Sequence, residues 1–151
     1  VLEAFGGEGV LWNEVKKRTN KKIKILSIDA NKYKRVQLQG DNIKFLNAFD
    51  LNEFDIIDLD AWGSPFKQLQ VLFNKKYNGI VHCTFIQTMQ GGVNKELLYA
   101  NGYTKKMVEK IPSLFRRNGV DKLMNYLHVK GVSSVKIISV KRKNYFWFKI
   151  A

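Results

Sequence analysis

Short apolar runs alternate with amphipathic stretches through the first half of the chain. The apolar runs are typical of buried strands, and the stretches between them place apolar residues three or four positions apart, as in helices that cover a sheet. The pattern predicts strands at Val1–Phe5, Ile23–Ile28, Ile43–Leu46, Phe54–Leu59 and Gly79–Ile86, and helices at Val10–Arg18, Asn31–Gln39 and Phe66–Lys76.

The second half changes character. We expect a helix at Asn94–Asn101, a second that Thr104 caps and Pro112 interrupts, and a third from Asp121 to Gly131. Strands at Val135–Val140 and Tyr145–Ile150 follow, joined by the hairpin-type sequence KRKN. Strands that alternate with helices predict the α/β class: a Rossmann-like, doubly wound sheet, mostly parallel, with an antiparallel C-terminal hairpin. The length of 151 residues favours a single domain over 1–151.

The charge balance points to an anionic partner. The chain carries 26 lysines and arginines against 13 aspartates and glutamates, which gives a net charge of +13. Such an excess favours nucleic acid first and an acidic membrane surface second. The basic residues come in short groups such as Lys141-Arg142-Lys143, so folding has to assemble any basic surface.

Other classes of protein are disfavoured by what the sequence lacks. It has no run of roughly 18 apolar residues and no signal-peptide pattern, so we expect no membrane span. The lone cysteine fits an intracellular setting, and we expect a cytoplasmic protein without a membrane partner. The single cysteine, Cys83, lies in an apolar strand and reads as a buried core residue rather than a nucleophile. His82 and His128 have no partners at metal-ligand spacing, so we expect no metal site.

A glycine-rich turn follows the first strand in VLEAFGGEG. In a parallel sheet this turn belongs at the carboxyl edge, where ligands bind. The dinucleotide pattern G-x-G-x-x-G fits at Gly7 and Gly9, but its third glycine falls on Trp12, which is too bulky. No Gly-Lys-Ser/Thr follows, so the P-loop pattern fails as well. Asp29, at the end of the second strand, could accept hydrogen bonds from a ribose diol or cap a helix.

This turn resembles the first motif of class I S-adenosylmethionine-dependent methyltransferases, an apolar pair and an acid followed by a glycine-rich turn. Phe5 stands in place of the motif's first glycine. The resemblance implies that S-adenosylmethionine is the cofactor, that Glu3 orders the loop and holds the cofactor's amino group through water, and that Asp29 binds the ribose. The cofactor-binding residues expected on this basis are Glu3, Phe5, Gly7, Gly9, Asp29, Asp58 and, near the adenine after the third strand, Phe49 and Asp50.

The sequence DLDAWGSP, at the end of the fourth predicted strand, looks like the DLDPFGSP motif of tRNA guanine-N2 methyltransferases. Ala61 replaces a proline and Trp62 replaces a phenylalanine or tyrosine, and the other positions match: Asp58, Leu59, Asp60, Gly63, Ser64 and Pro65. Loss of the proline predicts a less rigid loop.

The chemistry of this loop can be argued without the resemblance. An exocyclic amine on a base is a poor nucleophile, because its lone pair delocalises into the ring. A carboxylate that accepts the amine's hydrogens pushes electron density back onto nitrogen, and an adjacent aromatic ring can stack on an extruded base. We therefore expect Asp60 to be the catalytic acceptor and Trp62 the stacking platform. The alternative is that Asp58 and Asp60 cap a helix and Trp62 lies in the core.

The favoured function is methyl transfer to an exocyclic amino group of a nucleic-acid base, RNA rather than DNA, with tRNA guanine N2 as the nearest resemblance. The alternatives are an N6-adenine methyltransferase, a non-catalytic basic nucleic-acid-binding module that keeps the fold, and a dinucleotide-dependent reductase, which the missing third glycine disfavours. RNA would be held by the core itself, or by a protein partner or oligomer.

Overall fold

The computed structural model describes residues 1–86 and 93–151. Within these ranges seven strands form one sheet in the order β3-β2-β1-β4-β5-β7-β6. The strands are β1 (Leu2–Glu3), β2 (Leu26–Asp29), β3 (Leu38–Gln39), β4 (Ile56–Leu59), β5 (Ile80–Ile86), β6 (Val135–Val140) and β7 (Lys143–Lys149). Neighbours among β1–β5 are parallel, and β7 is antiparallel to both β5 and β6. The predicted α/β sheet with its antiparallel hairpin is confirmed.

Helices flank the sheet on both faces. They are α1 (Val10–Arg18), α2 (Asn42–Ala48), α3 (Phe66–Asn74), α4 (Lys95–Ala100), α5 (Lys105–Lys110), α6 (Ser113–Arg116) and α7 (Gly119–Val129), and a 3-10 turn, η1, spans Leu51–Glu53. Helix α1 has the predicted bounds, and Thr104 caps α5 as expected. Helix α7 begins two residues before Asp121, which lies in its first turn rather than at its cap.

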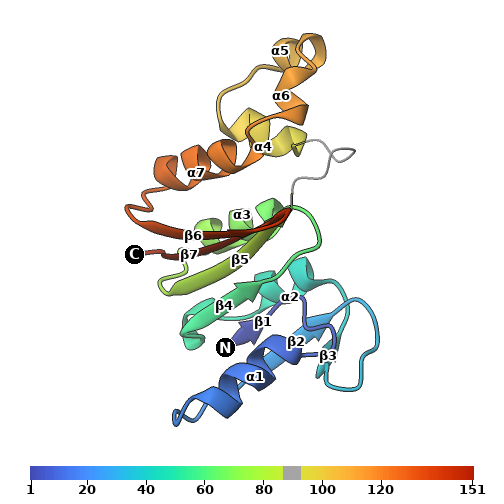
Figure 1. Ribbon diagram of the computed structural model, residues 1–151, viewed down its shortest axis with the longest axis vertical. Helices are drawn as coiled ribbons and strands as arrows, with labels where there is room; N and C mark the ends of the chain where they lie inside the picture. Colours follow the sequence, from blue (N-terminus) through green and yellow to red (C-terminus); the bar gives the residue numbers. More distant parts are fainter. Residues whose placement is uncertain (87–92) are drawn as a thin grey trace.

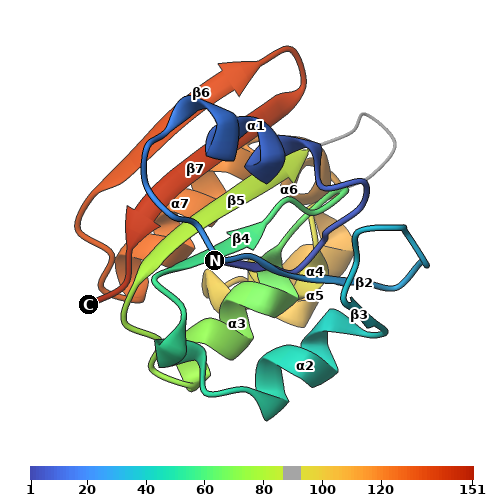
Figure 2. The same ribbon diagram turned by 90° about the horizontal axis from the view of Figure 1, so that it is seen from below.

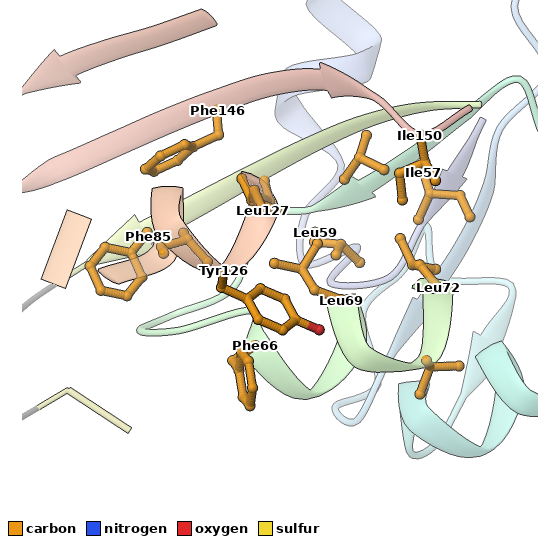
Figure 3. Packing of buried hydrophobic residues seen from close by; sticks show 14 of the residues in the cluster. Ile57, Leu59, Phe66, Leu69, Leu72, Phe85, Tyr126, Leu127, Phe146 and Ile150 are labelled. Atoms are coloured by element: carbon orange, nitrogen blue, oxygen red, sulfur yellow. The ribbon is translucent and has the colours of Figure 1, made fainter. Parts of the chain in front are cut away.

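The two faces of the sheet are covered unequally. Helix α1 lies at one end of the molecule in Figure 1 and in front of the strands in Figure 2, while α4 and α7 lie on the opposite side. The main core is on that opposite side, where Val81, Cys83 and Phe85 of β5 are buried. There the rings of Phe66 of α3 and Tyr126 of α7 pack edge to face, with their centroids 4.9 Å apart (Figure 3). We call the other side, which α1 covers, the α1 face.

Two predicted elements are wrong. The segment Asn31–Gln39 is not a helix: its backbone turns after Asp29, and Gln37 exchanges hydrogen bonds with Ser27 of β2, so that Leu38 and Gln39 form β3. The run Ile43–Leu46 is not a strand but part of α2, because the Asp41 side chain accepts from the Ile43 N–H and caps a helix there. A short apolar run fits either element, and the cap decides.

A buried polar cluster fastens α1 to the sheet. The Asp58 carboxylate of β4 accepts from Trp12 Nε1 of α1 at 2.5 Å, and its other oxygen lies 2.8 Å from His82 Nδ1 of β5. All three side chains are almost fully buried. The imidazole lies against Trp147 of β7, with ring centroids 4.5 Å apart. One carboxylate thus connects a helix and two strands.

Removal of the indole donor tests this connection. Trp12→Phe keeps an aromatic ring against the sheet but leaves one oxygen of a buried carboxylate without a partner, so we expect a loss of about 1–3 kcal/mol in the free energy of unfolding. Chemical denaturation measures it. Trp62→Phe is the matched control, because Trp62 is 87% exposed and its substitution should leave stability nearly unchanged. Equal stabilities of the two variants would contradict the role given to Trp12.

Candidate active site

The carboxyl ends of β1 and β4 flank the point where the order of the sheet reverses. From β1 the chain proceeds outward through β2 to β3, whereas β4 lies on the other side of β1 and leads to β5. Open α/β sheets bind ligands in the crevice at such a switch point. The glycine turn leaves β1 there, and Asp60 follows β4 there.

The glycine turn has backbone conformations that favour glycine. Gly7 and Gly9 have φ angles of 47° and 66°, in the left-handed region where a Cβ is strained. A Cβ on Gly6 would lie 2.9 Å from Ser27 Cβ, so the turn also passes close to β2. Gly9 then serves as the N-cap of α1. Part of the glycine content is therefore explained by a tight reversal between β1 and α1.

Asp29 connects this turn to β2. Its Oδ2 accepts from the Gly7 N–H at 3.0 Å, and its Oδ1 accepts from the Asn31 N–H at 2.8 Å. No helix begins after Asp29, so the helix-cap interpretation is wrong. A carboxylate offers about four acceptor positions, and two remain for a diol.

Glu3 lies beside this aspartate and is buried. Its carboxylate accepts from Ser27 Oγ at 2.6 Å. The pKa of Glu3 is raised to about 7, mainly by burial and in addition by the nearby carboxylates of Asp58, Asp60 and Asp29, while the Ser27 hydrogen bond acts in the opposite direction. The switch point therefore gathers several acids around a carboxyl group that titrates near neutrality.

The Asp60–Pro65 loop is exposed at its tip and fixed at its base. Asp60 is exposed and Trp62 is 87% exposed, so neither lies in the core. Ala61 is buried, and its N–H donates to the Leu59 carbonyl at 2.7 Å, a bond that a proline could not form. The Gly63 carbonyl accepts from the Ile86 N–H at 2.7 Å. These two bonds constrain the loop, although the motif's proline is replaced.

Two expected cofactor contacts lie elsewhere, and a third is engaged by other side chains of the fold. Phe49 and Asp50 follow α2 rather than a strand, on the approach to β4, which puts them at the amino edge of the sheet. There the Phe49 carbonyl accepts from Lys75 Nζ at 2.5 Å, and Asp50 caps η1. Asp58 is 1% exposed and both of its carboxylate oxygens are engaged, so it supports the fold rather than a ligand. Phe5 is half-buried beside the glycine turn and packs against the core.

Sequence reasoning missed Asn42, which lies after β3 at the carboxyl edge. Its Nδ2 donates to the Ala4 carbonyl at 3.0 Å, and its Oδ1 accepts from Gln68 Nε2 at 3.0 Å. Asn42 thereby ties the start of α2 to the end of β1 and to α3. The capping residue Asp41 is the signal that could have revealed this position.

The remaining side chains of interest have structural roles or lie at the surface. Cys83 is fully buried, and burial raises the pKa of its thiol, as expected for a core cysteine. His128 is exposed, whereas His82 belongs to the Asp58 cluster. Residues 1–86 and 93–151 contain no group of three or more metal-ligating side chains placed to hold an ion. Within the same ranges, no helix has the length and apolarity needed to cross a membrane.

Hollows of the surface touch α1 or the segments around it. One of about 670 Å³ lies at the amino edge, between Val1, Lys21–Leu26 and Glu53–Ile56, away from the switch point. A second, of about 420 Å³, is bordered by Glu3, Gly9 and Arg35 and reaches the glycine turn from the α1 face. The second hollow is bordered by Lys34 to Gln37, part of the loop that precedes β3.

Comparisons with known proteins are informative only at the level of structure. No family model and no curated protein matches the sequence. Among solved structures, an O-methyltransferase family protein from Burkholderia thailandensis matches with a TM-score of 0.58 and 13% identity, over 99% of this chain and 50% of its own. PigF with SAH matches with a TM-score of 0.54 and 15% identity, over 99% and 49%.

A candidate S-adenosyl-L-methionine-dependent methyltransferase from Methanococcus maripaludis matches with a TM-score of 0.50 and 20% identity, over 98% of this chain and 75% of its own. The chain thus spans about half the length of the first two of these proteins. At such identities the similarity concerns the fold. The chain has the class I methyltransferase fold.

Proposed function

We propose that this protein is an S-adenosylmethionine-dependent methyltransferase that acts on an exocyclic amino group of a nucleic-acid base, with the N2 of a tRNA guanine as the nearest resemblance. The observation that carries the proposal is the meeting of four features at the switch point: the glycine turn, Glu3, Asp29 and Asp60. The fold similarity supports it, and the nucleic-acid substrate rests on the DLDAWGSP motif and the net charge of +13.

The residues at the switch point suit a cationic ligand with a ribose. S-adenosylmethionine, when bound, supplies an electrophilic methyl group on a positively charged sulfur. The carboxylates of Glu3, Asp29 and Asp60 provide the opposite charge within an otherwise basic protein, and Asp29 keeps acceptor positions for a diol. Trp12, which stands where a dinucleotide site needs its third glycine, is buried against Asp58, and this disfavours a reductase.

Asp60 and Trp62 have the exposure that their proposed roles require. Trp62 offers an open ring face at the edge where Asp60 emerges, so a base extruded from its stack can rest on the indole. Asp60 accepts a hydrogen bond from the amine and stabilises the positive charge that grows on nitrogen as the nitrogen–methyl bond forms. An adenine N6 amine could donate the same hydrogen bond to Asp60, so N6-adenine methylation stays an alternative, and a non-catalytic module would bind without transfer.

Cofactor binding should depend on Asp29 and not on Asp50. Asp29→Ala removes charged hydrogen bonds to the ribose, so we expect binding of S-adenosylmethionine to weaken by about 1–3 kcal/mol in calorimetry. Asp29→Asn, which keeps one oxygen for the Gly7 N–H, should lose less. Asp50→Ala is the control, because Asp50 also caps a turn but lies at the amino edge. A stronger effect at Asp50 would contradict the site described here.

Glu3 should make cofactor affinity depend on pH. The pKa of Glu3 in the free protein is about 7, and a cationic ligand favours the ionised carboxylate, so binding releases a proton. Affinity should therefore rise with pH, by about tenfold between pH 6 and pH 8 if the bound carboxyl stays ionised throughout. Glu3→Gln should remove this rise in affinity with pH. Titration of the cofactor's own amine affects both proteins equally, so the difference between them reports Glu3. Parallel pH profiles of wild type and Glu3→Gln would exclude Glu3.

Asp60 should affect turnover rather than cofactor affinity. Its interaction strengthens only as the amine becomes cationic, so Asp60→Ala should lower kcat by about 10²-fold or more while the Kd of the cofactor stays nearly constant. The assay is transfer of a labelled methyl group to bulk tRNA, with single-stranded DNA as the competing substrate. Trp62→Ala should instead raise KM for the nucleic acid, through about 1–3 kcal/mol of lost stacking.

The outcomes of this assay separate the alternatives. Full activity of Asp60→Ala would remove the motif assignment, although the fold would stand. Transfer to neither nucleic acid by a wild-type protein that binds both cofactor and nucleic acid would favour the non-catalytic module. Location of the labelled methyl group by nuclease digestion distinguishes guanine N2 from adenine N6.

A further inference from the structure

The C-terminal hairpin leaves part of the α1 face open. Residues paired across neighbouring strands point to the same face, so Trp147 shares a face with Lys136, Tyr145 with Ile138, and Lys143 with Val140. Trp147 is on the α1 face, because it lies against His82. On this surface Ile138 is 61% exposed and Val140 is 51% exposed. We call these six side chains, together with Lys141, Arg142 and Lys149, the hairpin surface.

The charge of the hairpin surface is of one sign. From Lys122 to Ala151 the sequence contains no aspartate or glutamate. Within the described part of the chain, none of the lysines and arginines of the hairpin surface forms a salt bridge. Their charges are thus available to an external partner, and phosphate groups are the complement that a run of uncompensated lysines and arginines fits best.

Aromatic rings lie among these charges. One side of the Trp147 indole covers His82, and the residue also borders a hollow of about 410 Å³ together with Lys136 and Lys149. Tyr145 follows along β7 and is half-buried. Along this face β7 thus presents two adjacent aromatic rings, Tyr145 and Trp147, with Lys143 before them and Lys149 after them. Stacking positions flanked by phosphate-binding positions suit single-stranded nucleic acid.

The hairpin surface continues into the candidate active site. Lys143 pairs with Ile86 at the end of β5, and the Ile86 N–H donates to the Gly63 carbonyl of the Asp60–Pro65 loop. The Lys143 ammonium lies 5.9 Å from the centre of the Trp62 ring. The turn Lys141–Lys143 and the loop that carries Asp60 therefore lie side by side at the carboxyl edge.

We propose that the hairpin surface binds a single-stranded segment of nucleic acid and leads it to Trp62. The lysines and Arg142 contact phosphates, and Tyr145 and Trp147 support bases. From Trp147 to Lys143 this path runs about 13 Å along β7, at roughly 3.3 Å per residue. Its direction toward Asp60 rests on the proposed function, whereas binding itself does not.

Charge reversal tests the surface. The probes are fluorescent oligouridylate and oligothymidylate of equal length, followed by anisotropy over a salt series without cofactor. The hairpin variant combines Lys136→Glu with Arg142→Glu, and the control combines Lys106→Glu with Lys110→Glu on α5, where both lysines are exposed. We expect the hairpin variant to weaken binding at least tenfold and to lower the salt slope by about 1.4, at about 0.7 per phosphate contact. The control should weaken binding less than threefold.

Tryptophan fluorescence gives an independent readout. In Trp62→Phe the remaining indoles are Trp12, which is buried, and Trp147, so quenching by either oligonucleotide reports contact at Trp147. Retained quenching supports the proposal, and its loss overturns it. Tighter binding of oligouridylate would assign the strand to RNA, and tighter binding of oligothymidylate would assign it to DNA. Either result supports the proposed binding surface.

Other outcomes overturn the proposal. They are no binding at low salt, equal losses in the hairpin and control variants, or equally tight binding of a polyglutamate peptide of matched charge, which would point to an acidic protein. Failure of this surface is distinguishable from failure of the enzyme. If the wild type transfers methyl groups and the hairpin variant does so with unchanged KM, only the surface is wrong; if the surface binds both probes and no transfer occurs, only the enzyme is wrong.

Discussion

The buried carboxylate of Asp58 is the interaction on which the arrangement of the site depends. It accepts from Trp12 and contacts His82, so it holds the helix that follows the glycine turn against β4, which leads to the Asp60 loop, and β5, which pairs with the hairpin. A buried charge is tolerated only where it is paired and hydrogen-bonded, which restricts the position of α1 to one that satisfies it. The glycine turn is then fixed at both ends, by Glu3 in the sheet and by Gly9 at the start of the helix.

The sequence predicted the sheet well where periodicity was supported by length or by a cap. The patterns of α1, β4, α3 and β5 are long or strongly apolar. Each of these patterns fits either a helix or a strand, but not both. The segment from Asn31 to Leu46 failed because its apolar runs are short, and side-chain hydrogen bonds outweigh propensity there. Gln37 binds β2 and Asp41 caps α2, and neither bond is part of the apolar periodicity from which the elements were predicted.

The candidate site was predictable where a residue's role follows from its place at the end of a strand. Asp29 and Asp60 end or follow parallel strands, so the topology brings them to one edge whatever the loops do. Asp58 differs from Asp60. It lies two positions earlier on β4 and points to the same face, but it is inside the sheet, where it binds Trp12. Phe49 and Asp50 were expected at the carboxyl edge because Ile43–Leu46 was predicted as a strand. That segment is part of α2, so both residues lie at the amino edge instead.

The distribution of charge suits the two ligands of opposite sign that we propose. The chain carries a net charge of +13, yet Glu3, Asp29 and Asp60 gather at the switch point. An acidic centre would attract the proposed cationic cofactor, while the basic hairpin beside it would attract the proposed polyanion, and the two regions meet at Trp62, whose ring lies near the Lys143 ammonium. In that arrangement a base would reach the Trp62 ring while its phosphates stayed on the hairpin, away from the acids. The separation of charge would therefore orient the strand as well as attract it.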